Sequence, residues 1–298
     1  MPSRLIINAD DFGLTPGINR SIAELHHAGV LTSATLMATG PAFDDAVAIA
    51  HATPTLGVGC HIVLTDGVPA SSPESIPSLL GPDGKTFRPS LLDFVQALLR
   101  GRIREADIER EAQAQIDKLH RAGITITHAD THKHSHLFPA VTRPLLRVLE
   151  RNGINAIRNP FEPAFTQRLA HADFKRRFQI NLLNRLRPAF ERHPQFGNRS
   201  VLTPDGTLGV SATGNLNPST LSEILSAMPS NGTFELVCHP GYNDRDLDQV
   251  ATRLRAHREI EMQALLSAIP SALAQPNRIE LIHYGKLATT GEPATKHS

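Results

Sequence analysis

The chain has 298 residues, of which 40% are hydrophobic and 20% are charged, and its formal net charge is +1. This composition is that of an ordinary globular protein and gives no basis for nucleic-acid binding. No apolar run is long enough for a transmembrane helix, and two cysteines cannot form a disulfide framework. The amino terminus, M-P-S-R-L-I-I-N, enters a strand pattern at once, so we expect no signal peptide and a cytoplasmic location.

Short apolar runs alternate with amphipathic helical patterns along the chain. Runs rich in β-branched residues and bounded by turn signals predict strands at residues 5–8, 34–37, 56–64, 124–128, 155–158, 234–239 and 279–283. Helical periodicity separates most of them and predicts helices at residues 17–27, 43–52, 108–122, 141–152 and 247–268. Alternating strands and helices indicate a parallel sheet.

Polar residues follow almost every predicted strand. The successive strand ends carry A-D-D-F-G, C-H, a histidine-rich segment (residues 128–136), R-N-P, C-H-P-G and I-H-Y-G. A (β/α) barrel gathers its active site from many strand ends, whereas an open doubly wound sheet gathers ligands at one switch point. No G-x-G-x-x-G or Walker sequence supports nucleotide binding. We therefore predict an α/β fold, a distorted or incomplete (β/α) barrel of about seven parallel strands with the active site at their C-terminal ends.

We expect one catalytic domain over residues 1–288 with two insertions. Residues 66–90 are rich in Pro, Ser and Gly and lead to a helical pair, which predicts a loop over the site. The second insertion, residues 161–199, is basic and helical in pattern. Residues 289–298 are polar and unpatterned, so we expect a disordered tail.

The second insertion has an unusual charge and an apolar repeat. Residues 158–199 hold nine Arg or Lys against three Asp or Glu. Apolar side chains recur there at every fourth position, at Phe174, Phe178, Leu182, Leu186 and Phe190. A basic amphipathic helix can contact a membrane surface or a lipid-linked substrate, here through residues 164–192. The alternative is a lid helix that packs its apolar side on the barrel.

The histidine-rich segment reads H-A-D-T-H-K-H-S-H. Alternate side chains of an extended segment point to one face, so we expect a shared orientation for His128, Asp130, His132, His134 and His136. Imidazole is a common metal ligand and transfers protons near neutral pH. The alternative is a solvated histidine-rich loop.

Asp10 and Asp11 directly follow the first predicted strand. Adjacent carboxylates raise one another's pKa, and a divalent cation relieves this repulsion by taking one as a ligand and leaving the other as a base. The alternative is that one of them caps the next helix. With His61 and the histidine-rich segment, the pair supplies a carboxylate and two imidazoles, a set that holds a catalytic metal and leaves open positions.

Further polar residues at strand ends are also candidates for the site. His239 is a candidate general acid or base, because Pro240 and Gly241 stop the strand there. Arg158 orients a catalytic carboxylate or the substrate, or forms a structural ion pair. We expect His283 and Tyr284 to line the site. Cys60 and Cys238 should be small buried hydrophobic residues, and no G-x-S-x-G sequence supports a serine nucleophile.

Four motifs in order resemble the YdjC-like carbohydrate deacetylases, which include chitooligosaccharide deacetylases and hopanoid-associated HpnK-type proteins. They are L-I-I-N-A-D-D-F-G-L-T, G-C-H-I-V-L-T-D-G, D-T-H-K-H-S-H and C-H-P-G. The likeness extends from Leu5 to Tyr284 and is weakest over residues 161–213, where substrate preference would be encoded. Cys60 departs from the aliphatic residue or Met that is common before the motif histidine.

The resemblance implies a distorted barrel that removes N-acetyl groups from amino sugars with one divalent metal ion per chain. It implies Asp11, His61 and His132 as metal ligands. Asp10 is then the base that takes a proton from the attacking water, and His239 is the acid that protonates the leaving amine. Magnesium is the metal usually attached to the family, but this ligand set suits Zn²⁺ at least as well.

The resemblance places the remaining residues of the histidine-rich segment around this set. Asp130 would orient an imidazole, and His134 and His136 would line the substrate side or pack near the rim. Arg158, outside this segment, would contact the substrate or support the ligands from behind. The products would be acetate and a free amino sugar.

Several alternatives stay open at this point. The substrate could be a chitooligosaccharide, a glycosylated hopanoid lipid or another N-acetylated glycan. Another barrel metallohydrolase, acting on a cyclic amide or a phosphate ester, and a non-catalytic sugar- or lipid-binding protein are the competing functions. A homodimer is a fair expectation on general grounds.

Overall fold

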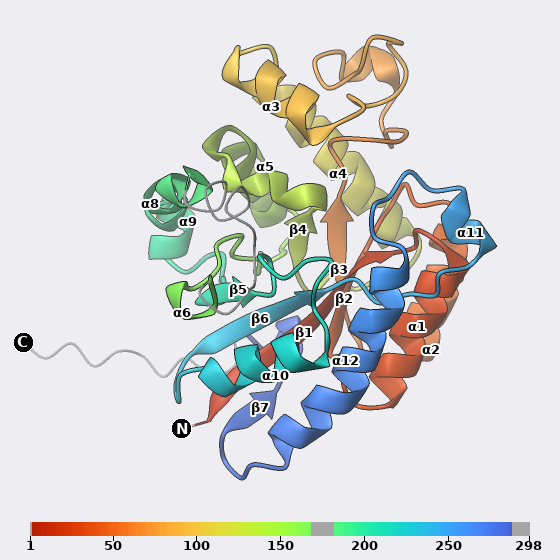
Figure 1. The fold of residues 1–298 in the computed structure, drawn as a ribbon. Helices are drawn as coiled ribbons and strands as arrows, with labels where there is room; N and C mark the ends of the chain where they lie inside the picture. The colour runs from red at the N-terminus through yellow and green to blue at the C-terminus, as the bar shows by residue number, and fades with distance from the viewer. Residues whose placement is uncertain (1, 168–181, 288–298) are drawn as a thin grey trace, which may run out of the picture.

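Seven parallel strands form one sheet that curls into an incomplete barrel, as predicted (Figure 1). The computed structural model describes residues 2–167 and 182–287. The strands are β1 (Ser3–Phe12), β2 (Ser33–Leu36), β3 (Gly57–Ile62), β4 (Ala129–Thr131), β5 (Gly206–Leu208), β6 (Thr233–Cys238) and β7 (Ile279–Leu281). Their order is β4-β3-β2-β1-β6-β5, with β7 paired to β1. The longest strand, β1, lies in the middle and is buried along nearly all of its length, which explains its continuous apolar sequence.

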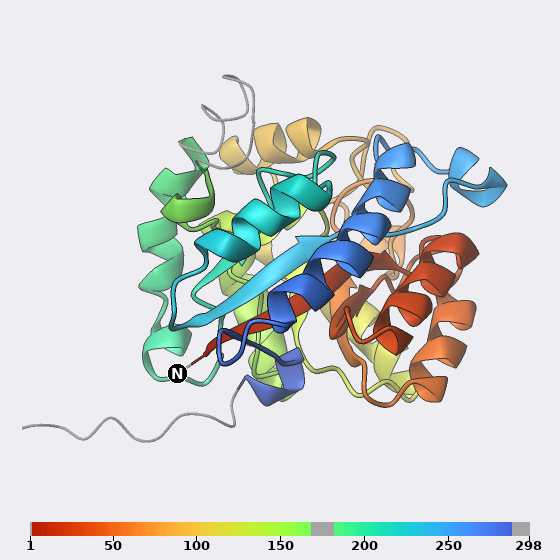
Figure 2. The same ribbon diagram turned by 60° about the horizontal axis from the view of Figure 1, so that its bottom comes forward.

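The helices lie around the outside of this sheet (Figures 1 and 2). The longer ones are α1 (Pro16–His27), α2 (Phe43–Ala52), α3 (Leu91–Leu99), α4 (Glu105–Arg121), α5 (Pro139–Arg151), α10 (Pro218–Ala227) and α12 (Ala256–Leu273). Short helices are α6 (Ala164–Gln167), α8 (Arg187–Glu191), α9 (Pro194–Gly197) and α11 (Arg245–Asp248), with 3-10 turns η1 (Pro73–Ser75), η2 (His132–Leu137), η3 (Asn184–Leu186) and η4 (Tyr284–Lys286). Helix α12 packs between α10 and α1, and α4 packs on α5. None of the helices in the described ranges is both long enough and apolar enough to cross a bilayer.

The predicted helix at residues 247–268 begins too early. Asp244 caps the separate short helix α11 by accepting a hydrogen bond from the backbone of Leu247. Residues 249–255 are not helical, and α12 begins only at Ala256. The predictions for α1 and α2 are confirmed to within one residue.

Two of the predicted strands are wrong. Residues 124–128 form no strand, and β4 starts one residue later, at Ala129. Residues 155–158 make only the isolated bridges Ala129–Ile157 and Ala156–Leu202. The strand that pairs with β6 on that side is β5, which was not predicted. Among the described residues, no named strand joins the two ends of the sheet path; isolated bridges and hydrogen bonds such as that from Thr207 N to the Phe161 carbonyl link them, so the barrel is incomplete there.

The last strand, β7, pairs with the N-terminal end of β1, whereas the predicted site lies at the C-terminal end. Strand β7 pairs with Ser3–Leu5 of β1, and Leu281 lies beside Leu5. Asp10 lies five residues further along β1, roughly 16 Å at the usual rise of a strand. His283 therefore lies toward the opposite end of the barrel, and the expectation that it lines the site is wrong. Tyr284 is buried, and its hydroxyl donates to Glu235 Oε2, so it adjoins the polar network below Asp10 instead of lining the site directly.

The two insertions differ in how far the structure describes them. Residues 66–90 contain η1 and an antiparallel bridge between Leu80 and Phe87, and they lead into α3 and α4, as predicted. In the second insertion Phe174 and Phe178 lie outside the described residues, as does the predicted tail. Of the same apolar series, Leu182 is 49% exposed, whereas Phe190 is buried in a cluster with Leu137 and Phe161.

Candidate active site

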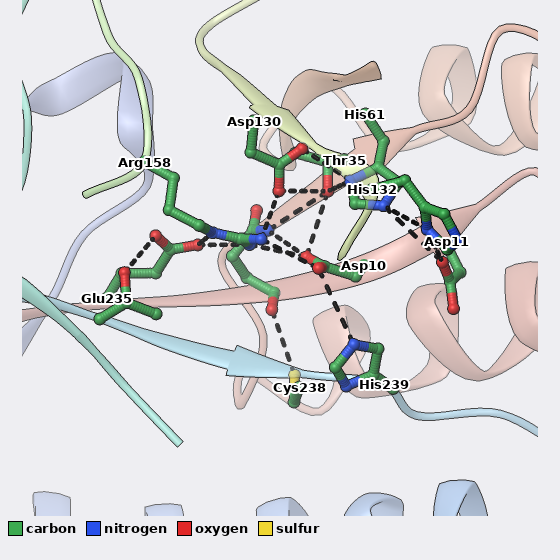
Figure 3. A network of polar contacts seen from close by, with 12 residues as sticks. Asp10, Asp11, Thr35, His61, Asp130, His132, Arg158, Glu235, Cys238 and His239 are labelled. Carbon is green, nitrogen blue, oxygen red and sulfur yellow. Dashed lines mark hydrogen bonds and ion pairs between the residues drawn. The ribbon is translucent and has the colours of Figure 1, made fainter. Parts of the chain in front are cut away.

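Asp10 and Asp11 both point into the site although they are neighbours on one strand. Alternation along β1 would send their side chains to opposite faces. The pairing of β1 with β2 shifts register between Ala9 and Phe12, and Asp11 has a φ of 65°, in the left-handed region that non-glycine residues seldom occupy. This irregularity turns both carboxylates toward the same space (Figure 3).

Asp11, His61 and His132 converge on one point (Figure 3). Asp11 Oδ1 lies 3.8 Å from His61 Nε2 and 3.5 Å from His132 Nδ1, and the two ring nitrogens are 3.2 Å apart. Asp11 and His61 are buried, whereas the His132 side chain is 22% exposed. One carboxylate oxygen and two imidazole nitrogens facing each other at such distances form a donor set that fits a divalent transition ion.

Asp130 lies directly behind His61. Its Oδ1 accepts a hydrogen bond of 2.7 Å from His61 Nδ1, and it is completely buried. Burial lowers the pKa of His61, but the carboxylate of Asp130 and then that of Asp10 outweigh it and raise the pKa to about 9. Because Nδ1 carries the proton toward Asp130, Nε2 is the ring nitrogen presented to Asp11 and His132.

The histidine-rich segment does not stay extended. Strand β4 ends at Thr131, and η2 follows with left-handed backbone at Lys133 (φ 57°) and His134 (φ 52°). The expected orientation of all five side chains to one face is therefore wrong beyond Thr131. His128 lies deeper in the barrel, where its ring stacks on Tyr284 at 3.7 Å between centroids.

His134 and His136 have different surroundings. His136 is fully buried; it donates from Nε2 to the carbonyl of Arg158 at 3.1 Å and accepts at Nδ1 from the Thr131 hydroxyl. Burial and then the Arg158 charge lower the pKa of His136 to about 3, so it is a neutral support for the Arg158 backbone. His134 is half-buried, and its Nδ1 has no hydrogen-bond partner among the described residues.

Arg158 is the centre of a buried carboxylate network (Figure 3). Its side chain is fully buried and bonds both oxygens of Asp10, at 2.9 and 2.6 Å. The same guanidinium lies 2.6 Å from Asp130 and 2.7 Å from Glu235. Burial raises the pKa of Asp10, but Arg158 and then His61 outweigh it and hold this pKa well below its usual range. Arg158 therefore favours the ionised form of Asp10 and fixes its orientation.

His239 follows β6 and faces Asp10 from the other side. Its Nε2 lies 3.8 Å from Asp10 Oδ2, and its backbone N–H donates to Glu261 at 2.6 Å. Burial lowers the pKa of His239, but Glu261 and then Asp10 outweigh it and raise this pKa above its ordinary value. A histidine whose pKa is raised and that lies beside an ionised carboxylate is suited to donate a proton.

The two cysteines are buried and free, as expected. Burial raises the pKa of both thiols, and Cys238 donates to the backbone carbonyl of Asn8 at 3.4 Å. Neither has the depressed pKa that a nucleophilic cysteine needs.

Sequence reasoning missed three buried charged residues that touch the site. Glu235 lies in the apolar run of β6 and contacts Arg158, whereas Arg258 and Glu261 lie on α12 and contact Asp11 and His239. A charge inside an apolar strand was the available signal for Glu235. No local signal identifies the other two, because their partners are distant in sequence.

The arrangement combines three chemical capacities in one buried space. It has a donor set for a divalent ion, an ionised carboxylate held by an arginine, and an imidazole whose proton is stabilised by a second carboxylate. These are the parts of a hydrolase that activates water and protonates a leaving group.

The chain is similar to known proteins along most of its length. The family model described as YdjC-like protein matches residues 4–275. The chain is 31% identical over 284 residues to a carbohydrate deacetylase of Brevibacillus brevis, a match that covers 95% of this chain and 99% of the relative. It is 41% identical over 168 residues to a carbohydrate deacetylase of Geobacillus stearothermophilus, covering 56% of this chain and 62% of the relative. A solved structure from Enterococcus faecalis V583, whose description proposes cellobiose-phosphate cleavage, matches with a TM-score of 0.76 at 26% identity and covers 96% of this chain and 99% of its own.

Proposed function

Since this chain belongs to the YdjC-like protein family, we propose that it is a metal-dependent enzyme that hydrolyses the N-acetyl group of an N-acetylated amino sugar. The class of enzyme, a carbohydrate deacetylase, is that of its curated relatives. The observation that carries the proposal is the convergence of Asp11, His61 and His132 beside Asp10 and His239. The sugar is part of an oligosaccharide or a glycolipid.

Asp11, His61 and His132 would hold the ion, which when bound supplies Lewis-acid polarisation of the amide carbonyl and makes water more acidic. One oxygen and two nitrogens suit Zn²⁺ or another transition ion, and Mg²⁺ is the competing choice. Asp130 fixes the tautomer of His61 from behind.

Asp10 accepts the proton of the attacking water. Arg158 orients the two oxygens of Asp10, and the low pKa of this carboxylate makes it a weak base, so it would depend on an ion held by Asp11, His61 and His132 to make the water more acidic. His239 donates a proton to the leaving amine nitrogen, and the carboxylate of Glu261, 3.8 Å from Nδ1, raises the pKa of this imidazole and so favours its protonated form. Proton transfer of this kind contributes a rate factor of about 10²–10⁴.

Replacing the base tests this assignment. Asp10→Asn should keep its metal and its fold but lose turnover by about 10²–10⁴, because an amide cannot accept the proton. Asp11→Asn should lose metal and activity together. Metal content and acetate release, measured on the same preparations, distinguish the two variants, and a fully active Asp10→Asn would refute the base assignment.

The substrate is identified by acetate release with metal-free and metal-restored enzyme. The panel contains N-acetylated oligosaccharides, N-acetylated glycolipids and a phosphorylated disaccharide. The last is included because the description of the Enterococcus protein names cellobiose-phosphate. Phosphate or sugar release without acetate would support another barrel metallohydrolase instead of the deacetylase.

A further inference from the structure

Arg258 is a buried arginine that reaches the candidate metal site from outside the sheet. It lies in the first turn of α12 and is 1% exposed. Its Nη2 donates to Asp11 Oδ2 at 2.6 Å, and its Nε donates to the carbonyl of Leu254 at 3.0 Å. Nη1 lies 3.5 Å from the carbonyl of His239. The guanidinium therefore joins β1, α12 and the end of β6.

The two oxygens of Asp11 have different partners. Oδ1 faces the ring nitrogens of His61 and His132, at 3.8 and 3.5 Å. Oδ2 is the oxygen bonded to Arg258. Since the backbone of Asp11 is held in the left-handed region, rotation of the side chain is the remaining freedom, and the bond to Arg258 removes it.

Gly241 leaves space for the Arg258 side chain. A Cβ at this position would lie 3.1 Å from Arg258 Cδ, 3.6 Å from Arg258 Cβ and 2.8 Å from Ile18 Cγ1. The glycine of the C-H-P-G motif thus leaves room for the stem of the arginine. This second observation shows that the position of Arg258 is specified by packing as well as by charge.

An ordinary structural ion pair is the alternative explanation. A buried pair of that kind commonly contributes little net stability, because desolvation offsets the attraction. Among the described residues, however, the carboxylate that pairs with Arg258 is the one whose other oxygen faces two imidazoles. An arginine at that point determines which oxygen remains for an ion.

We propose that Arg258 is a positioning residue of the metal site: it occupies Asp11 Oδ2 and so leaves Oδ1 alone to the ion shared with His61 and His132. This inference rests on the proposed metal-dependent function. It goes beyond that function because it assigns a role to a residue outside the ligand set. Without the arginine, Asp11 would rotate or offer both oxygens, and the surroundings of the ion would change.

Co²⁺ is a suitable probe because its visible absorption reports the surroundings of the bound ion directly. The experiment titrates Co²⁺ into metal-free wild type, Arg258→Met and Arg258→Lys, and follows the spectrum, the Kd, kcat and KM. Arg255→Met is the matched control, since Arg255 lies three residues earlier and pairs with Asp248 at the surface.

We expect Arg258→Met to bind Co²⁺ with an altered spectrum and a kcat about 10- to 100-fold lower, at similar KM. Arg258→Lys should recover the wild-type spectrum in part, because an ammonium can still donate to Oδ2. Arg255→Met should match wild type in all four quantities. If Arg258→Met does not fold, Gly241→Ala, whose Cβ would crowd Arg258 Cδ as well as Ile18 Cγ1, should change the spectrum in the same direction.

Two results would overturn the inference. In the first, Asp11→Asn loses Co²⁺ binding, which shows that the wild type binds the ion through Asp11, but Arg258→Met keeps the wild-type spectrum and kcat. This result refutes the role of Arg258 and leaves the metal site standing. A wild-type protein that binds no Co²⁺, or that binds it equally in Asp11→Asn, refutes the proposed metal site and this inference with it.

Discussion

Asp10 and Asp11 show how two identical neighbouring side chains acquire different chemistry from their partners. Arg158 bonds both oxygens of Asp10, so this carboxylate keeps one orientation. Neither of its oxygens faces two imidazoles. Asp11 divides its oxygens between Arg258 and the imidazoles of His61 and His132. The two side chains are about equally buried, so the difference comes from the neighbours that the irregular backbone of β1 gives each of them.

His239 gives a prediction about the pH dependence of turnover. A general acid must be protonated, so activity should fall as pH rises through the pKa of His239, which Glu261 raises. Glu261→Gln removes that carboxylate and lowers the pKa. We therefore expect the alkaline limb of the profile of kcat against pH to move to lower pH in this variant.

The control for this shift is Glu259→Gln. Glu259 is exposed two residues earlier on α12 and accepts a hydrogen bond from the backbone of Asn243. Its variant should keep the wild-type alkaline limb. An unmoved limb in Glu261→Gln, with normal folding, would show that His239 is not the acid that limits turnover.

At the scale of elements, strand β3 passes unusually close to a pair of stacked rings. A Cβ on Gly59 would lie 2.4–2.6 Å from the imidazole of His128, which stacks on Tyr284. His128 also bonds Asn8 at 3.1 Å, and Asn8 bonds Asp10 at 3.2 Å. Gly59 therefore leaves space for His128, which is linked to the candidate base Asp10 through Asn8.

Gly59→Ala should destabilise the protein by about 1–3 kcal/mol, because the added methyl group displaces a packed ring. The free energy of unfolding in urea, with circular dichroism as the signal, measures the loss. Gly197→Ala is the control: Gly197 ends α9, and no heavy atom outside its own turn lies within 4 Å of the added Cβ. An equal effect of the two substitutions would contradict the packing argument.

Elements with a strong periodic pattern could be predicted from the sequence, and short pairing segments could not. Helix α2 and the strands β1, β2, β3 and β6 follow apolar patterns that local sequence expresses directly. Strand β5 has three residues, Gly-Thr-Leu, whose extended form depends on pairing with β6. The local sequence contains no information about such a partner.

Some residues of the candidate site could likewise be predicted from the sequence, and others could not. Asp10, Asp11, His61, His132 and His239 could be identified because each stands at a strand end or in a motif. The turn at Lys133 and His134 depends on left-handed backbone in two non-glycine residues, which no periodicity indicates. The contacts of Arg258 and Glu261 depend on how α12 docks, which is a property of the complete fold.

At the scale of the whole molecule, the three candidate ligands join segments that are distant in sequence. Asp11 belongs to β1, His61 to β3 and His132 to the turn after β4. The unfolded chain does not hold these groups together, so an ion that binds them binds the folded state alone. Such binding stabilises a protein by RT ln(1 + [L]/Kd), about 2.7 kcal/mol when the free ion is at 100 times its Kd.

Restoring a divalent ion to metal-free protein should therefore raise Tm by several degrees, and a chelator should reverse the rise. Asp11→Asn should abolish the rise, because it removes the carboxylate that faces both imidazoles. His283→Asn should retain it, since His283 lies at the opposite end of the barrel beyond β7. Differential scanning calorimetry with Zn²⁺, Co²⁺ and Mg²⁺ measures the shifts and ranks the ions. If Asp11→Asn gains as much as wild type from the same ion, that ion binds elsewhere, and the strand ends of β1, β3 and β4 are not its site.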